Sequence, residues 1–180
     1  MIKSKPTIGF IGAGNMGLPM VKSLIKKDFE VKVYDINPNI TKKLEKDNIK
    51  AVNNLRAVAS NQFIISILPD TQNVESVFNN DTGINSYLKP GTIVIDMSTI
   101  ASSSAIQIGK ILQKIQIEFL DAPVSGGVKG ASNANLSIMI GGKKETYKKS
   151  LDILNSLGEN IVYAGKLGMG QVFKMCNQIM

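Results

Sequence analysis

The side chain best suited to proton chemistry is a lysine near the end of the printed chain. The sequence contains no histidine, which excludes Ser-His-Asp and Cys-His catalysis and any zinc site that depends on imidazole. Lys174 lies in a stretch typical of a helix, where Gln171, Asn177 and Gln178 share its face through i, i+3 and i+4 spacing. If this face meets a cleft, loss of hydration lowers the pKa of Lys174 and suits it to exchange a proton. A polar stripe that simply meets solvent is the alternative.

A second set of residues, near residue 1, is suited to binding phosphate. A strand expected over residues 7–11 runs into Gly12, Gly14 and Gly17 in the pattern G-x-G-x-x-G, followed by a helix. The first glycine permits a tight turn, the second lets the backbone approach a pyrophosphate, and the third lets the helix pack on the strand. The N–H groups and dipole of the helix N-terminus favour a bound anion there. The apolar face of this helix is expected to hold Leu18, Val21 and Ile25.

An acidic residue follows the glycine pattern at an informative distance. Asp35 lies 18 residues after Gly17, where a second strand is expected to end. A carboxylate at this place accepts hydrogen bonds from the ribose hydroxyls of NAD and repels the 2′-phosphate of NADP. The residues therefore favour NAD over NADP, although a strand-end turn over residues 35–38 would also use an aspartate.

A third candidate site combines a hydroxyl with flexible backbone. Ser125, Gly126 and Gly127 offer one side-chain hydroxyl and successive unobstructed N–H groups, which suit a carboxylate ligand. A flexible surface loop is the alternative reading of the same glycines.

The elements that must position these residues alternate along the chain. Strands are expected over residues 7–11, 30–35, 63–68, 92–96, 118–121, 136–140 and 160–163. Helices are expected over residues 16–27, 38–47, 71–78, 102–115 and 144–157, besides the last segment, 168–180. Alternation of apolar strands with helices predicts an α/β fold with a Rossmann-type, doubly wound, mostly parallel sheet. The candidate residues gather where the strands end, which is where such sheets bind ligands.

Composition narrows the function further. The formal net charge is +7, but the lysines are scattered in pairs along predicted helices without an arginine or aromatic cluster. We therefore expect no nucleic-acid partner. No stretch is long enough to span a membrane, and we expect no membrane partner. The one cysteine, Cys176, excludes an internal disulfide, so the cytoplasm is the expected compartment. No metal site is expected.

Taken together, these motifs resemble the β-hydroxyacid dehydrogenases, the group of 3-hydroxyisobutyrate dehydrogenase and tartronate semialdehyde reductase. Residues 12–20 are similar to their cofactor signature, residues 67–69 to a loop that passes the cofactor, and residues 96–100 to another cofactor-side segment. Residues 121–130 resemble the substrate motif and residues 168–178 the catalytic motif. The resemblance covers the whole chain in five ordered motifs.

The resemblance implies a role for each site residue. Lys174 is the implied acid–base residue, with Ser125, Gly126, Gly127 and Asn177 as implied substrate contacts. The implied cofactor contacts are Ile11, Gly12, Ala13, Gly14, Asn15, Met16, Gly17, Asp35, Leu68, Pro69 and Thr99. The implied reaction interconverts a small 3-hydroxy acid and its semialdehyde by hydride transfer with NAD, or less favourably NADP.

The chain departs from the family pattern at several positions. Gln178 stands where a second asparagine is usual, Ala134 where the family has glycine, and Ser102 where proline is common. None of these changes removes the lysine.

The largest departure is length. The resemblance implies a Rossmann domain over residues 1–164 and the start of an interdomain helix over residues 165–180. The all-helical domain that follows in the family, and that supplies a homo-oligomer interface, is absent from the 180 residues. A helix that is apolar on most sides should be buried, and the apolar residues here are Val172, Phe173, Met175, Cys176, Ile179 and Met180. With the chain stopping six residues after Lys174, Met175, Cys176, Ile179 and Met180 are expected to lack this cover and to form an exposed apolar patch, unless another chain covers them. A cofactor-binding domain without catalysis of its own is the alternative function.

Overall fold

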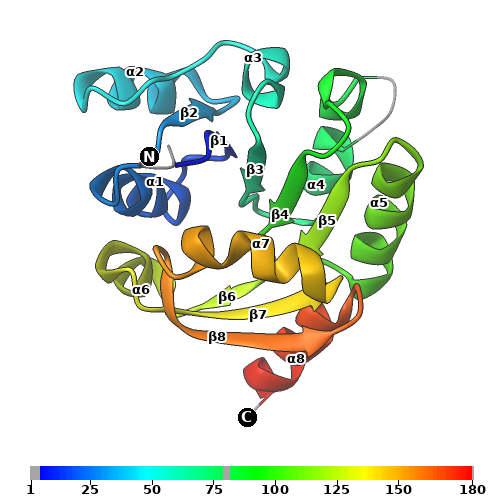
Figure 1. Ribbon diagram of the computed structural model, residues 1–180. Helices are drawn as coiled ribbons and strands as arrows, with labels where there is room; N and C mark the ends of the chain where they lie inside the picture. The colour runs from blue at the N-terminus through cyan, green and yellow to red at the C-terminus, as the bar shows by residue number, and fades with distance from the viewer. Residues whose placement is uncertain (1–4, 79–81, 180) are drawn as a thin grey trace.

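A twisted sheet forms the centre of the molecule, and its first half is parallel. The computed structural model describes residues 5–78 and 82–179. The parallel strands are β1 (Ile8–Ile11), β2 (Val31–Tyr34), β3 (Phe63–Ser66), β4 (Ile93–Asp96) and β5 (Glu118–Asp121). They lie in the order β2-β1-β3-β4-β5. The chain therefore starts in the middle of the sheet, moves to one edge, and then crosses β1 to build the other side (Figure 1).

This reversal of direction between β1 and β3 places a crevice at the carboxyl ends of these two strands. Successive strands on either side of the reversal send their connections over opposite faces of the sheet, so the loops separate there. Beyond β2, Ala51 forms an isolated parallel bridge with Val33. The candidate nucleotide turn at Gly12 thus lies at the switch point of a doubly wound sheet.

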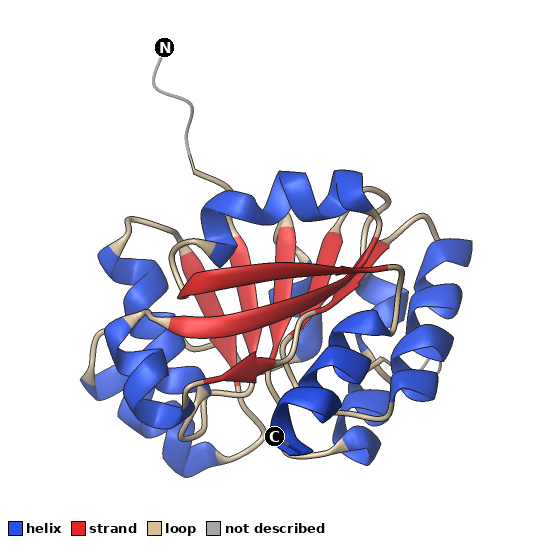
Figure 2. Ribbon diagram, turned by 90° about the horizontal axis from the view of Figure 1, so that it is seen from below, coloured by secondary structure: helices blue, strands red, loops and turns tan. Residues whose placement is uncertain are grey.

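The second half of the sheet has a different pattern. Its strands are β6 (Val124–Ser125), β7 (Leu136–Gly142) and β8 (Gly158–Gly165). β7 runs antiparallel to both β5 and β6, and β8 runs parallel to β7. In Figure 2 the long strands β7 and β8 cross in front of the others at a steep angle. The sheet is accordingly mostly parallel, as the sequence predicts, with an antiparallel extension.

Helices cover both faces because the central strands are apolar on both sides. In β3, Phe63 and Ile65 pack into one core and Ile64 into the other. The first core is shared with α1 (Gly17–Lys26), α2 (Pro38–Lys46), α6 (Gly127–Asn133) and α7 (Lys144–Leu154). The second core is shared with α3 (Leu55–Ala59), α4 (Thr71–Val77), the 3-10 turn η1 (Ile84–Tyr87) and α5 (Ser102–Lys114).

The last helix, α8 (Met169–Ile179), packs by its first turns against β5, β7, β8 and α5. Its far end leaves the body of the protein, next to the C-terminus in Figure 1. Phe173, Met175 and Cys176 are exposed, and Ile179 is 79% exposed. The exposed apolar patch expected at Met175, Cys176 and Ile179 is therefore found, whereas the general expectation that such an apolar helix is buried holds only for its first turns. Met180 lies outside the described residues.

The fold class and all the expected elements are found, with bounds that shift by a few residues. The sequence patterns missed β6, α3, α6 and η1, which are too short for a periodic signal. The expected face of α1 is partly wrong. Ile25 is exposed, and Met20 and Leu24 are buried with Val21, because the helix turns toward β1 from Gly17.

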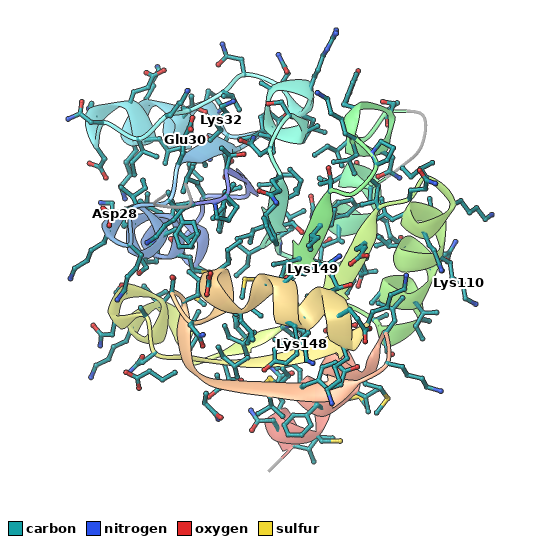
Figure 3. The ribbon with its side chains drawn as sticks, in the orientation of Figure 1. Asp28, Glu30, Lys32, Lys110, Lys148 and Lys149 are labelled. Carbon is teal, nitrogen blue, oxygen red and sulfur yellow. The ribbon has the colours of Figure 1, made fainter. Side chains whose placement is uncertain are left out.

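Two further observations bear on partners. None of the described helices is long and apolar enough to cross a membrane. The lysines labelled in Figure 3 extend from separate elements, Lys32 from β2, Lys110 from α5, and Lys148 and Lys149 from α7. The charge is therefore dispersed over these elements.

Candidate active site

The glycine turn after β1 is compact because backbone passes close to it on two sides. Gly12 has φ +92°, and a Cβ there would overlap the carbonyl oxygen of Ile67. A Cβ on Gly17 would overlap the carbonyl oxygen of Gly12. Glycine is required at both positions, at Gly12 for conformation and space and at Gly17 for space alone.

The opening of α1 is suited to an anion. Its N-cap residue, Met16, makes no side-chain capping bond, and the first turn contains no acidic residue. Gly14 is exposed, and a Cβ there would meet nothing within 4 Å. The turn therefore presents open backbone at the positive end of a helix dipole, which fits the pyrophosphate of a dinucleotide.

Asp35 joins this turn to the end of β2. Its Oδ2 accepts a hydrogen bond from the N–H of Ala13 at 2.7 Å, and its Oδ1 accepts one from the N–H of Asn37 at 2.8 Å. Each carboxylate oxygen has a further lone pair available. The same carboxylate therefore braces the glycine turn and retains acceptors for ribose hydroxyls.

These elements enclose a cleft of about 600 Å³. Its lining includes nine of the eleven expected cofactor residues: Ile11, Gly12, Gly14, Asn15, Met16, Gly17, Asp35, Leu68 and Pro69. Ala13 is buried behind the turn, with its N–H on Asp35. Thr99 is exposed and lies outside this lining. Sequence reasoning missed the apolar walls of the cleft, among them Ile40, Leu55 and Val77, since their loops and helices carry no motif.

A buried polar network supports the loops beside the cleft. Asp96, fully buried at the end of β4, accepts hydrogen bonds from the hydroxyls of Ser66 at 2.8 Å and Ser98 at 2.6 Å. The hydroxyl of Ser98 in turn accepts the N–H of Leu68 at 2.9 Å. Burial, with a smaller contribution from the nearby carboxylate of Asp121, raises the pKa of Asp96 to about 6 against the lowering effect of these hydrogen bonds.

A second group of polar side chains, the Lys174 group, consists of Lys174 and Asn177 of α8 and Ser125 of β6. Lys174 is only 7% exposed, and its Nζ lies 2.8 Å from the Oγ of Ser125. Asn177, one turn later, donates from Nδ2 to the same oxygen at 3.1 Å. Burial lowers the pKa of Lys174, and it is the only cause of the shift. A buried amine whose hydrogen-bond partner is a hydroxyl is a suitable general acid–base group.

Two glycines adjoin this group and begin α6. Gly126 and Gly127 have φ of +126° and +60°, and both are exposed. A Cβ on Gly127 would meet open space. The flexible loop considered from the sequence is instead a strand end followed by a helix, so Ser125 and the two glycines have fixed positions at the rim of the Lys174 group.

The polar stripe of α8 divides along its length. Gln171 and Lys174 are buried, whereas Asn177 and Gln178 are exposed. The stripe therefore faces the strand ends in its first turns and the solvent afterwards. Asp121, which sequence reasoning grouped only with the substrate motif, is buried and accepts the N–H groups of Gly168 and Gln171.

The positions that depart from the family pattern also have defined surroundings. Ser102 donates its hydroxyl to the carbonyl of Gly168 at 2.9 Å, a bond that proline cannot make. Ala134 follows α6 with φ +55°, in the left-handed region that glycine adopts more readily.

Comparison with known proteins gives a consistent result. Residues 7–165 match the family described as the NAD binding domain of 6-phosphogluconate dehydrogenase. The mitochondrial 3-hydroxyisobutyrate dehydrogenase of Mus musculus is 37% identical over 178 residues, which are 98% of this chain and 53% of the relative. The NAD-dependent L-serine dehydrogenase of Pseudomonas aeruginosa is 39% identical over 94% of this chain and 57% of its own.

Solved structures agree. The 3-hydroxyisobutyrate dehydrogenase of Mycobacterium tuberculosis with L-serine superposes with a TM-score of 0.92 and 32% identity, over 97% of this chain and 59% of that one. The chain thus spans about half the length of the curated relatives it matches. The cofactor expected from Asp35, NAD, agrees with the family description. The chain belongs to the NAD-binding domain family of 6-phosphogluconate dehydrogenase, and its relatives include the 3-hydroxyisobutyrate dehydrogenases.

Proposed function

We propose that this chain carries the cofactor site and the acid–base lysine of an NAD-dependent dehydrogenase for small 3-hydroxy acids. One observation carries the proposal: the buried amine of Lys174 lies 2.8 Å from Ser125, beside Gly126 and Gly127. An amine with a lowered pKa and a neighbouring set of carboxylate-binding groups is what oxidation of a hydroxy acid requires. The family relationship adds the dehydrogenase chemistry.

Lys174 takes the hydroxyl proton during oxidation and returns it to the carbonyl oxygen during reduction. Its lowered pKa increases the fraction of neutral amine near neutral pH. Asn177, bound to the same Ser125 oxygen, orients the substrate next to the amine. Ser125, Gly126 and Gly127 hold the substrate carboxylate through one hydroxyl and two N–H groups.

The cleft at the glycine turn would hold the cofactor. Bound NAD would supply the hydride acceptor for oxidation of the carbinol carbon. Gly12, Gly14 and the start of α1 bind its pyrophosphate, and Asp35 accepts hydrogen bonds from its ribose. Because Asp35 would repel a 2′-phosphate, NAD is preferred over NADP.

The catalytic helix leads out of the nucleotide-binding domain. We assign residues 1–164 to that domain and residues 165–180 to the start of the helix that follows it. The family match over residues 7–165 and the exposed apolar end of α8 support this division. A homo-oligomer of the longer family form is the corresponding assembly. The alternative is a domain that binds NAD without turnover of its own.

The proposed compartment is the cytoplasm. The one cysteine, Cys176, is exposed and has no cysteine in this chain with which to form a disulfide. Several relatives are named as mitochondrial, so fractionation of cells that express the tagged protein would distinguish the two.

The decisive experiment combines cofactor titration with turnover. We expect the protein to bind NAD more tightly than NADP and to oxidise 3-hydroxyisobutyrate or L-serine but not lactate, a 2-hydroxy acid. Lys174→Met should lower kcat by about 10²- to 10⁴-fold because the proton acceptor is lost. Its Kd for NAD should not change, because Lys174 lies outside the lining of the nucleotide cleft.

A matched control is Lys110→Met, which removes an exposed lysine on α5 that points away from the body of the protein (Figure 3). It should behave as the unaltered protein. Full turnover in Lys174→Met would refute the assigned role of the lysine. Binding of NAD without turnover at high substrate would favour the alternative function.

A further inference from the structure

Gln171 is a buried polar residue to which the proposed reaction assigns no role. It lies in the first turn of α8 and is only 4% exposed. Its Nε2 donates to the carbonyl of Ser98 at 2.8 Å, and its Oε1 accepts the N–H of Ile100 at 3.1 Å. The amide therefore binds the backbone on both sides of Thr99, the expected cofactor contact beyond β4.

The segment that Gln171 holds is itself tied to the cofactor cleft. The hydroxyl of Ser98 accepts the N–H of Leu68, which lines the cleft, and donates to buried Asp96. A continuous set of hydrogen bonds thus runs from the rim of the cleft through Ser98 to the first turn of α8. These hydrogen bonds link the rim of the cleft to α8, and Oδ2 of Asp96 is the one buried atom of this set that has no partner among the described residues.

A second residue, Asp121, also binds the first turn of α8. Asp121, buried at the end of β5, accepts the N–H of Gly168 through Oδ1 at 2.7 Å and the N–H of Gln171 through Oδ2 at 3.0 Å. A carboxylate at this place satisfies N–H groups that a helix start otherwise leaves unpaired. A Cβ on Gly170 would lie 2.7 Å from the carbonyl oxygen of Asp121, so the turn is in direct contact with the strand end.

Lys174 follows Gln171 by three residues. This spacing puts both side chains on one face of the helix, with their Cα atoms about 4.5 Å apart along its axis. The place of the amine relative to the Thr99 segment is therefore determined by how the first turn of α8 is held.

We propose that Gln171, supported by Asp121, is a positioning residue that sets the distance between the cofactor-side segment at Thr99 and the amine of Lys174. The inference rests on the proposed function, because it concerns the same lysine. Only a long neutral amide meets the requirement. A glutamate would direct a carboxylate oxygen at the carbonyl of Ser98, and an asparagine is one methylene too short to bind both partners.

The test uses Gln171→Met, which keeps the length of the side chain and removes both hydrogen bonds. We expect the Kd for NAD and the KM for the hydroxy acid to stay within about twofold, while kcat falls about 100-fold through misplacement of the amine. Gln113→Met, the same change at an exposed position of α5, is the control and should leave all three unchanged.

A second readout does not depend on turnover. The lysines are reductively methylated with ¹³C-formaldehyde and cyanoborohydride, and the signal of Lys174 is identified by its absence in Lys174→Arg. In the unaltered protein this signal should titrate below the ordinary range of lysine, since burial lowers the pKa of Lys174. The two carboxylates of β5 have other partners than Lys174. Asp121 accepts an N–H group from the first turn of α8, and Glu118 contacts Thr146 and Lys149 of α7. In Gln171→Met the titration should move back toward the ordinary range as water reaches the amine.

The outcomes separate the two proposals. A folded Gln171→Met with unaltered kcat and an unaltered Lys174 titration overturns the positioning role alone. Full turnover in Lys174→Met overturns the proposed function, whatever Gln171→Met does. If Gln171→Met fails to fold, Gln171→Asn keeps a buried amide that can bind only one partner, and the same two readouts decide.

Discussion

The cofactor cleft and the Lys174 group are built in different ways, although both lie at strand ends of one sheet. The glycine turn of the cleft uses residues 11–17, which are consecutive in the chain, and the turn is limited by the backbone carbonyls of Ile67 and Gly12. The Lys174 group joins Ser125 to Lys174 across 49 residues of sequence through side-chain hydrogen bonds. The first is a property of a motif, and the second is a property of the fold.

This difference has an energetic side. Close contacts between backbone atoms relax little, so a single methyl group is costly at Gly12 or Gly17, where such contacts limit the turn. The Lys174 group depends on side-chain hydrogen bonds around one buried amine, and the titration of that amine responds to pH. Asp96 and Asp121 lie between the two regions and are both fully buried. Changes in the cleft should therefore act through sterics, and changes near Lys174 through protonation and hydrogen bonding.

The largest effect on stability is expected for Gly17→Ala. The added methyl group would overlap the carbonyl oxygen of Gly12, so α1 must move away from the turn. We expect a loss of about 3 kcal/mol in the free energy of unfolding, and at least tenfold weaker binding of NAD. Urea denaturation and NAD titration measure the two effects.

The matched variant is Gly14→Ala, in which the new methyl group meets nothing within 4 Å. Its stability should be close to that of the unaltered protein, while NAD binding weakens because the pyrophosphate approaches this backbone. Equal stability of the two variants would show that the backbone contacts at Gly17 do not limit the side chain at this position.

The next effect concerns pH. The pKa of Asp96 is raised to about 6 in the folded protein, above its value when exposed. Between pH 4 and 6 the folded state therefore holds this proton more tightly than the unfolded state, so stability from this group falls as pH rises and is constant above that window. Asn cannot titrate. Between pH 4 and pH 7, the free energy of unfolding of the unaltered protein should therefore fall by about 2–3 kcal/mol relative to that of Asp96→Asn.

Urea denaturation at several pH values between 4 and 7 tests this expectation. Asp28→Asn, which changes an exposed aspartate with φ +60°, controls for the loss of one negative charge. Parallel stability curves for the unaltered protein and Asp96→Asn would show that the buried network between the two regions does not respond to pH.

The smallest effect is expected for Ala134→Gly, near the Lys174 group. Ala134 has φ +55° after α6, whereas in the cleft glycine occupies the position with positive φ. Relief of the left-handed strain, offset by greater freedom of the unfolded chain, should stabilise the protein by about 0.5–1 kcal/mol. Thermal unfolding measures it, and a lower midpoint would mean that the strain is compensated by packing.

Much of this architecture could be predicted from the sequence, for identifiable reasons. Period-2 and period-3.6 patterns located all the long elements, and Gly12, Gly17 and Asp35 indicated the nucleotide site because turns and strand ends carry residue-specific constraints. The short elements β6 and α6 escaped prediction because their state depends on what packs against them. The roles of the site residues themselves stay predictions.

The sequence by itself determined the parallel Rossmann-type sheet, the glycine turn and the candidate lysine, since each is encoded in neighbouring residues. Only the tertiary structure decided which polar groups meet. It turned Gln171 away from the solvent and onto the backbone of Ser98 and Ile100, and it placed Asp121 under the first turn of α8. A hydrogen bond between residues 50 or 70 positions apart leaves no local pattern, because its partners become neighbours only when the strands between them have been ordered in the sheet.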